Sequence, residues 1–196
     1  MYQYIKRMID IFMSFVAIII FSPLMLLTAI VIKLDSKGPV LFKQKRVGKD
    51  KTHFQIYKFR TMYQDTPGDV PTHQLQGAKS TITRVGGFLR KSSLDELPQL
   101  FNILKGDMSV IGPRPALWNQ YDLIEERDKY GANDIRPGLT GWAQINGRDE
   151  LEIPVKAKLD GYYKQQMNFF FDVKCFFGTI VSIMKADGVK EGSNQK

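Results

Sequence analysis

The feature that most constrains this chain is an uncharged run, Ile11 to Ile32, with a proline near its middle. These 22 residues would form a helix about 33 Å long, enough to cross the hydrocarbon core of a bilayer. The Ser22-Pro23 pair lies at the centre of the run. Proline has no N–H to donate and its ring crowds the carbonyl four residues earlier, so we expect a kink. The run therefore predicts a membrane helix that is not straight.

Basic residues on both sides of the run indicate whether the helix crosses the membrane or returns to the same side. Lys6 and Arg7 precede it, and a strongly basic stretch follows it. Lys and Arg beside a membrane segment favour the cytoplasmic side. A re-entrant helix that bends at Ser22-Pro23 keeps both flanks on that side, whereas a kinked full span places one flank outside. We favour the re-entrant path and keep the full span as the alternative. A cleaved signal peptide is disfavoured because Asp10 precedes an overlong apolar run.

The composition limits the classes of partner. The chain has 196 residues, 28 of them Lys or Arg and 20 Asp or Glu, for a net charge of +8. Beside a membrane segment, such a basic chain is expected to bind lipid headgroups or phosphorylated substrates, and no nucleic-acid-binding motif is found. Cys175 is the single cysteine, which excludes a disulfide framework, and His53 and His73 are too isolated to indicate zinc.

The periodicity predicts an α+β fold that is mainly helical. Residues 39–60 alternate on either side of VGKDKT and predict a small β-hairpin. The remaining predicted segments are a loop at 63–80, helices at 81–91, 92–106 and 116–130, and a turn-rich stretch at 136–148. We expect three parts: the re-entrant membrane helix at 1–33, a cytosol-facing domain at 34–185, and a tail at 186–196.

Residues 162–185 carry a second membrane signal. Apolar side chains such as Phe170, Val173 and Phe177 recur three to four residues apart, but charged residues interrupt the run. Such a segment is a poor membrane span. It suits either an amphipathic helix in the membrane interface or a core helix with aromatic contacts, and the two interpretations stand equal.

Asp95 and Glu96, in SSLDELP, are the main candidates for chemistry. Pro98 is tolerated only near a helix start, so we expect the helix to begin close to Asp95. There the helix dipole would hold the carboxylate pKa low and keep the group ionised, as a nucleophile or a Mg²⁺ ligand requires. The competing interpretation is a capping box, with Ser93 and Glu96 satisfying the first turn.

Several arginines strengthen the functional interpretation. Arg90, Arg114, Arg136 and Arg148 lie beside glycines, prolines and turns, and the guanidinium fork matches phosphate oxygens. Arg114 lies between Pro113 and Pro115, which stiffen the backbone on both sides. Together with a carboxylate pair and a membrane segment, these residues indicate an anionic substrate at a bilayer surface. Lys58 belongs either to the same basic site or to a solvated edge of the hairpin.

The chain resembles the bacterial sugar transferase family. The resemblance rests on the order of KFRTM, SSLDELPQLFNILKGDMSVIGPRP and RPGLTGWAQINGR behind an apolar segment with Ser-Pro, and it covers nearly the whole chain. These enzymes are monotopic phosphoglycosyl transferases of cell-surface polysaccharide assembly, and this chain is similar to the short form that consists of the catalytic unit.

The resemblance implies a reaction and roles for particular residues. A sugar-1-phosphate moves from a UDP-sugar to undecaprenyl phosphate, and UMP leaves. Asp95 would be the nucleophile that carries a covalent phosphosugar, with Glu96 as its acidic partner and Mg²⁺ near Asp95. The loop at 113–115 would lie near the nucleotide, and Arg90, Arg114 and Arg148 near phosphates. Ser22-Pro23 would break the membrane helix into a re-entrant one.

The expected location is the cytoplasmic face of the bacterial inner membrane. The stretch PRPALWNQYDLIEER resembles family members that use N-acetylated amino sugars, and glucose and galactose are the alternative sugars. A homodimer is also possible under the resemblance.

Two other functions compete with the transferase. A non-catalytic adaptor that holds anionic lipid would release no UMP, and a direct glycosyltransferase would release UDP.

Overall fold

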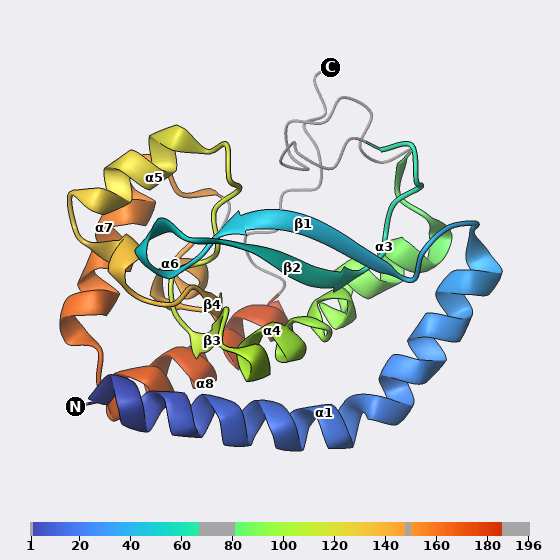
Figure 1. Ribbon diagram of the computed structural model, residues 1–196, viewed down its shortest axis with the longest axis horizontal. Coiled ribbons are helices and arrows are strands. Elements are labelled where there is room, and N and C mark those ends of the chain that lie inside the picture. The colour runs from blue at the N-terminus through green and yellow to red at the C-terminus, as the bar shows by residue number, and fades with distance from the viewer. Residues whose placement is uncertain (1, 67–80, 148–149, 186–196) are drawn as a thin grey trace.

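The computed structural model describes residues 2–66, 81–147 and 150–185, and it confirms a mainly helical α+β fold with a small hairpin. Figure 1 shows helix α1 along one edge and the remaining elements gathered on one side of it. The elements are α1 (Tyr2–Asp35), β1 (Leu41–Val47), η1 (Lys49–Lys51), β2 (His53–Phe59), α3 (Arg84–Lys91), η3 (Leu94–Glu96), α4 (Gln99–Lys105), β3 (Ser109–Ile111), α5 (Tyr121–Asp128), η4 (Ala132–Asp134), β4 (Gly138–Thr140), α6 (Trp142–Ile145), α7 (Ile153–Gln166) and α8 (Phe169–Lys185).

The hairpin forms where the alternation predicts it. Strands β1 and β2 pair antiparallel with Val47 opposite His53, and the intervening VGKDKT contains the short turn η1. Ile56 on β2 is buried and packs in a core cluster with Ile103 and Met108. Helix α4 ends at Gly106, as predicted, because this glycine adopts the left-handed conformation (φ 104°) that closes a helix.

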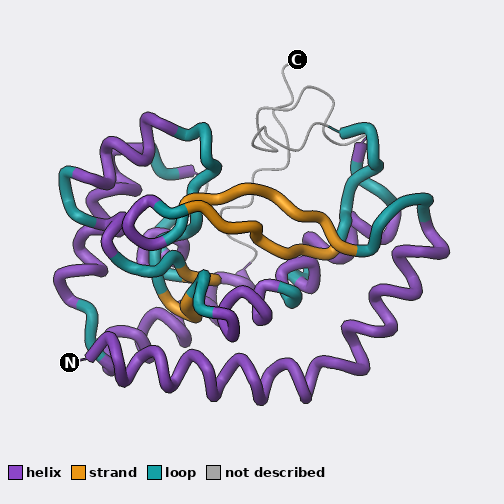
Figure 2. The backbone as a smooth tube through the Cα atoms, viewed as in Figure 1, coloured by secondary structure: helices purple, strands orange, loops and turns teal. Residues whose placement is uncertain are grey.

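A second, parallel sheet was not predicted. Strand β3 pairs with β4, so the stretch 136–148 contains a strand within its turns (Figure 2). Three residues are too few to show alternation. At Gly138 the two backbones approach so closely that an added Cβ would lie 2.1 Å from the Gly112 nitrogen, which only glycine permits.

Helix α1 buries several polar side chains against the protein and exposes most of its large apolar side chains. Lys6, Asp10, Ser14 and Thr28 are buried, and the Val110 N–H donates to Asp10 Oδ1 at 3.0 Å. The exposed side chains are largely apolar, among them Met8, Phe12, Phe15, Ile19, Ile20, Leu26, Leu27 and Ile30. By length and composition α1 could cross a membrane, and its outward face is suited to lipid rather than water.

Both ends of α1 contact the same domain. Near the N-terminus, Lys6 Nζ donates to Asp172 of α8 at 2.6 Å. Near the C-terminus, Ile32 is buried in a cluster with Phe59 of β2 and Leu89 of α3. One compact unit therefore holds both ends of the helix.

Pro23 bends α1 without ending it. The helix continues from Tyr2 to Asp35 with Pro23 inside it, and Figure 1 shows it curving along its length. Pro23 cannot donate to the carbonyl of Ile19, and the Ser22 hydroxyl donates to that carbonyl instead, at 2.9 Å. In lipid an unsatisfied carbonyl is costly, so Ser22 compensates for the proline beside it. The expected break is therefore a bend within one helix.

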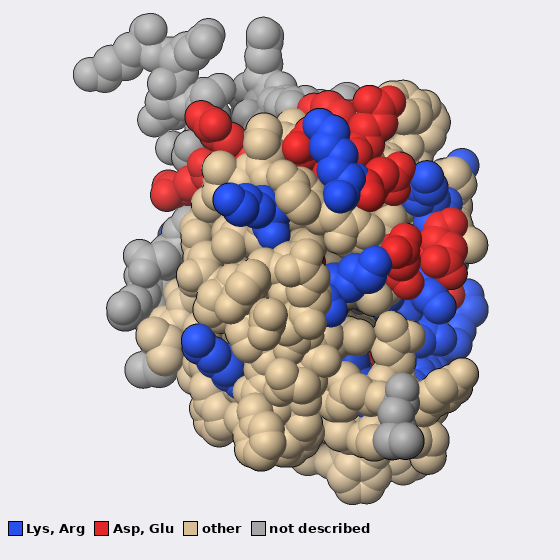
Figure 3. Space-filling model, turned by 90° about the vertical axis from the view of Figure 1, so that its left-hand side faces the viewer, with Lys and Arg blue, Asp and Glu red and all other residues tan. Residues whose placement is uncertain are grey.

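The predicted helix at 162–185 is two helices, which corrects that boundary. Helix α7 ends at Gln166 and α8 begins at Phe169, because Met167 leaves the helical conformation and Asn168 Oδ1 accepts from the Phe171 N–H at 3.0 Å. The core interpretation holds for one face of α8, on which Cys175 is buried. On the other face Phe170 and Phe177 are exposed, as an interfacial helix would require, so that interpretation stays a prediction. On the face shown in Figure 3 the charged side chains gather toward the top, and the lower rim, on the side of α1, is uncharged in its described atoms.

The buried carboxylate of Asp172 joins three helices. It accepts hydrogen bonds from Tyr2 Oη and Tyr163 Oη, each at 2.6 Å, and from Lys6 Nζ. Its charge is therefore paired and hydrogen-bonded, as a buried charge requires.

We predict that Asp172→Asn destabilises the protein by about 3 kcal/mol, because the substitution leaves the Lys6 ammonium buried without its counter-charge. Thermal unfolding in detergent, followed by circular dichroism, measures this loss. The matched control is Asp50→Asn, which breaks an exposed ion pair with Lys49 and should change stability by less than about 0.5 kcal/mol. Equal effects for the two variants would contradict the prediction.

Candidate active site

Asp95 and Glu96 lie on η3, a short turn between α3 and α4. Ser93 precedes the turn with φ 56° and makes no capping hydrogen bond, so the expected capping box does not form. Helix α4 begins at Gln99, after Pro98, and not near Asp95. Because Pro98 has no N–H, it suits the start of a helix, and the residues before it form a separate turn. This turn directs both carboxylates toward the hairpin.

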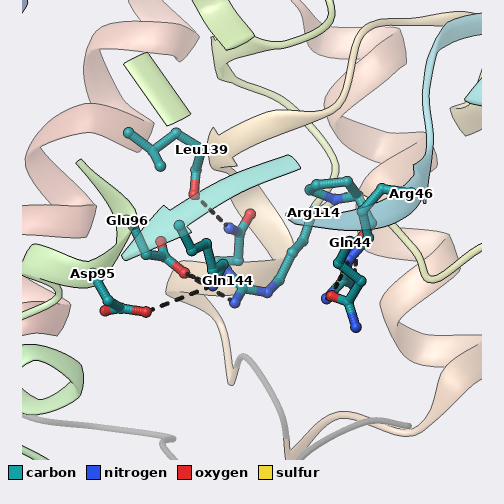
Figure 4. A network of polar contacts seen from close by, with 9 residues as sticks. Gln44, Arg46, Asp95, Glu96, Arg114, Leu139 and Gln144 are labelled. Atoms are coloured by element: carbon teal, nitrogen blue, oxygen red, sulfur yellow. Dashed lines mark hydrogen bonds and ion pairs between the residues drawn. The ribbon is translucent and has the colours of Figure 1, made fainter. Parts of the chain in front are cut away.

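Two cations meet the Glu96 carboxylate (Figure 4). Lys58 Nζ of β2 lies 2.7 Å from Glu96 Oε1 and 3.9 Å from Asp95 Oδ2. Arg114 Nη2 lies 3.2 Å from the same Glu96 oxygen. The Lys58 side chain is only 18% exposed, so it faces the carboxylate pair and does not form a solvated edge of the hairpin.

Burial raises the pKa of Asp95 above its ordinary value. The neighbouring charges oppose one another: Lys58, Arg90 and Arg114 lower this pKa, and Glu96 raises it. The expectation of a low pKa set by a helix dipole was therefore wrong. Asp95 is not in the first turn of α4, and its side chain is 12% exposed, so desolvation outweighs the cations.

The 113–115 loop is tied to both sheets. The Gly138 N–H donates to the Pro113 carbonyl at 2.8 Å, and Arg46 Nη1 of β1 donates to the Pro115 carbonyl at 2.9 Å. The backbone of Arg46 also bridges to Leu117. These contacts fix the loop from which Arg114 reaches Glu96.

Arg46 is a site residue that the sequence analysis did not single out. Its guanidinium also donates to Gln44 Oε1, with Nε at 3.0 Å. Burial, with a smaller contribution from Arg114, lowers the pKa of Arg46 to about 9. In the sequence it is one basic residue among many, and only its placement behind the loop distinguishes it.

The other predicted arginines differ in position. Arg90 of α3 is close enough to Asp95 to lower its pKa, and its Nη1 is buried with no hydrogen bond to the described part of the chain. Arg136 lies elsewhere and donates from Nε to the Gly106 carbonyl at 2.9 Å. Arg148 is outside the described residues.

The carboxylate pair suits one mode of Mg²⁺ binding. Within the residues that the structure describes, no three His, Cys, Asp or Glu side chains form a cluster that could hold a metal alone. In phosphate-binding sites Mg²⁺ takes one or two carboxylates and completes its shell with water and substrate oxygens. Asp95 and Glu96 fit that limited role.

The chain belongs to the bacterial sugar transferase family, because the family model matches residues 1–186. This result confirms the resemblance inferred from the motifs. In this member the site is a carboxylate pair flanked by cations, next to a helix with an exposed apolar face.

Three relatives illustrate the range of the family. The chain is 43% identical, over 96% of its length, to a protein of Aeromonas hydrophila named UDP-N-acetylgalactosamine-undecaprenyl-phosphate N-acetylgalactosaminephosphotransferase, of which it covers 46%. It is 39% identical, over 90% of its length, to the Escherichia coli (strain K12) protein named UDP-glucose:undecaprenyl-phosphate glucose-1-phosphate transferase, of which it covers 39%. It is 40% identical, over 91% of its length, to the exopolysaccharide production protein PSS of Rhizobium leguminosarum bv. phaseoli, of which it covers 94%. The chain thus spans less than half of the first two and nearly all of the third.

We predict that Arg46→Lys lowers stability by about 1–3 kcal/mol, because one ammonium cannot reach both Gln44 and the Pro115 carbonyl and so leaves a buried acceptor unpaired. Thermal unfolding in detergent tests this prediction. Lys49→Arg, at an exposed position in the turn, is the control and should be nearly neutral. An Arg46→Lys protein as stable as this control would show that the loop does not depend on the guanidinium.

Proposed function

We propose that the protein transfers a sugar-1-phosphate from a UDP-sugar to undecaprenyl phosphate and releases UMP, as the first membrane step of polysaccharide or glycoconjugate synthesis. The observation that carries the proposal is the Asp95–Glu96 pair held against Lys58 and Arg114. The names of the Aeromonas and Escherichia relatives support the undecaprenyl phosphate acceptor.

In the proposed mechanism Asp95 is the nucleophile. A carboxylate oxygen of Asp95 attacks the β-phosphorus of the UDP-sugar, the bond from that phosphorus to the UMP oxygen breaks, and UMP leaves with the bonding electrons. An oxygen of undecaprenyl phosphate then attacks the same phosphorus and displaces Asp95. Splitting the transfer into two displacements lets one phosphate site serve both substrates.

The contacts explain the different roles of the two carboxylates. Glu96 Oε1 has two cations within 3.2 Å, whereas Lys58 Nζ is 3.9 Å from Asp95. A carboxylate engaged by two cations is a poor nucleophile, so Glu96 is better suited to orienting Lys58 and Arg114. These cations, with Arg90, offset the repulsion between an anionic substrate and Asp95.

Mg²⁺ is the proposed cofactor, held by Asp95 with Glu96 beside it. When bound, it would neutralise charge on the diphosphate and on the leaving UMP. The residues of the chain do the rest of the positioning: Arg114 and Arg90 bind phosphate oxygens, and the 113–115 loop lies against the nucleotide.

The contacts at both ends of α1 support a re-entrant, monotopic arrangement. The apolar face of α1 and the exposed phenylalanines of α8 would enter one leaflet. The basic flanks favour the cytoplasmic side, where nucleotide-sugars are found. The site would then lie at the membrane surface, where a lipid phosphate can reach it.

The sugar that we propose is an N-acetylated amino sugar. Support comes from the 43% identity to the Aeromonas protein, which is named for N-acetylgalactosamine, although the Escherichia relative is named for glucose. A panel of UDP-sugars with undecaprenyl phosphate and Mg²⁺, assayed by UMP release, tests both the reaction and the sugar. An adaptor would release no nucleotide, and a direct glycosyltransferase would release UDP.

We predict that Asp95→Asn abolishes turnover and the covalent adduct, because the amide cannot form the acyl phosphate. Intact-mass spectrometry after incubation with UDP-sugar and Mg²⁺ should show a phosphosugar mass on the wild-type protein only. The control is Asp50→Asn, an exposed substitution that should keep the adduct. Full activity in Asp95→Asn would rule out Asp95 as the nucleophile.

We predict that acidification inactivates the enzyme at a pH above the ordinary aspartate pKa of about 3.9. Only ionised Asp95 attacks, and burial raises its pKa, so protonation and inactivation begin at higher pH. Since Lys58 lowers this pKa, Lys58→Met should move the acid limb of the UMP-release profile further upward. Lys51→Met, which removes an exposed partner of Asp128, should leave the limb in place. A limb that does not respond to Lys58 would contradict the assignment.

A further inference from the structure

A cavity of about 380 Å³ reaches Glu96, the neighbour of Asp95. Glu96 and Arg114 form part of its lining, and other walls come from α1, the segment from α3 to α4, β3, the β4–α6 segment and α8. Its volume is within the range of small-ligand sites. The cavity therefore connects the charged site with the two helices whose apolar faces are exposed.

The lining combines the charged pair Glu96–Arg114 with a larger apolar part. Leu97, Leu100 and Leu139 belong to that apolar part, and α1 and α8 contribute Phe21, Phe176 and Ile180 to it. The last three are each at least 39% exposed, so they also belong to the outward apolar surface. A ligand that fits this lining has an anionic head for Arg114 and an apolar chain that continues into lipid.

Three hydroxyl groups of the wall are satisfied within the protein. Thr140 and Thr179 hydrogen-bond to each other at 2.7 Å, and Thr179 also donates to the Cys175 carbonyl. The Ser92 hydroxyl donates to the Phe88 carbonyl at 2.9 Å. An apolar chain can therefore lie against these three without leaving a buried donor unpaired. Gln144 Oε1, in the same wall, is buried with no hydrogen bond to the described residues, so a polar group is best placed near it.

We propose that this cavity binds the phosphate-proximal isoprene units of the polyprenyl phosphate acceptor, with the acceptor phosphate toward Arg114. The inference rests on the proposed function and deepens it, since it identifies the part of the acceptor that the protein recognises. The cavity has the volume of a small-ligand site, so it holds only the first few isoprene units of the acceptor, roughly two or three. The rest of the chain lies in the bilayer without specific contact.

The first test compares acceptors of increasing length, with one, two, three, four and eleven isoprene units, in the same detergent. For the wild-type protein, kcat/KM should rise about tenfold or more with each added unit up to the second or third, and then level off. Ile180→Trp and Ala17→Leu, which fill the cavity, should end the rise at least one unit earlier. The KM for UDP-sugar should stay unchanged.

Val181→Trp is the matched control, because Val181 is the exposed neighbour of Ile180 and does not line the cavity. It should reproduce the wild-type length profile. The inference is overturned if the profile keeps rising without a plateau, or if both cavity variants keep the wild-type profile.

The second test does not depend on turnover. Geranyl phosphate with a photoreactive diazirine at its distal end should crosslink to α1 and α8 around Ala17 and Ile180, and Ile180→Trp should reduce this labelling while Val181→Trp does not. Labelling here without UMP release would refute the proposed function and keep the cavity assignment. Normal UMP release with labelling elsewhere would refute the cavity assignment alone.

Discussion

The structure depends on the inverted polarity of helix α1. A soluble protein buries the apolar face of a helix, but α1 buries Lys6, Asp10, Ser14 and Thr28 and exposes its apolar side chains. Lys6 and Asp10 bind the domain near the N-terminus, whereas Ser14 and Thr28 donate to carbonyls of α1 itself. The C-terminal end is held by the apolar cluster of Ile32 with Phe59 and Leu89. Because these contacts hold both ends of α1, its exposed apolar surface remains available to lipid.

Helix α1 also lies against the elements that carry the site. The charged pair lies on η3, between helices that pack against α1, and the hairpin brings Lys58 to it from the other side. Three cations, Lys58, Arg90 and Arg114, act on two carboxylates. The local excess of positive charge favours anions, and the apolar cavity beside it is lined in part by α1 and α8. In the proposed function, a charged donor from water and a lipid acceptor would meet at Asp95.

Sequence patterns predicted those elements whose residues alternate regularly, form a long uncharged run or end at a glycine. The hairpin followed from alternation, the end of α4 from Gly106, and the membrane helix from its uncharged length. Strand β4 was missed because it has three residues and begins with glycine. The pKa direction of Asp95 was missed because burial depends on tertiary packing, which outweighed a local helix rule. Arg46 could not be distinguished among the basic residues of the hairpin, since its role comes from a contact with the distant Pro115 carbonyl.

In the proposed arrangement, both ends of α1 lie on the cytoplasmic side. Single cysteines introduced as Gln3→Cys and Lys37→Cys, each in a Cys175→Ala background, test it by labelling intact cells with a membrane-impermeant thiol reagent. Both positions are exposed in the protein, so both should be labelled after permeabilisation. We expect that neither is labelled in intact cells. Labelling of one cysteine and not the other in intact cells would show a full span and contradict the re-entrant arrangement.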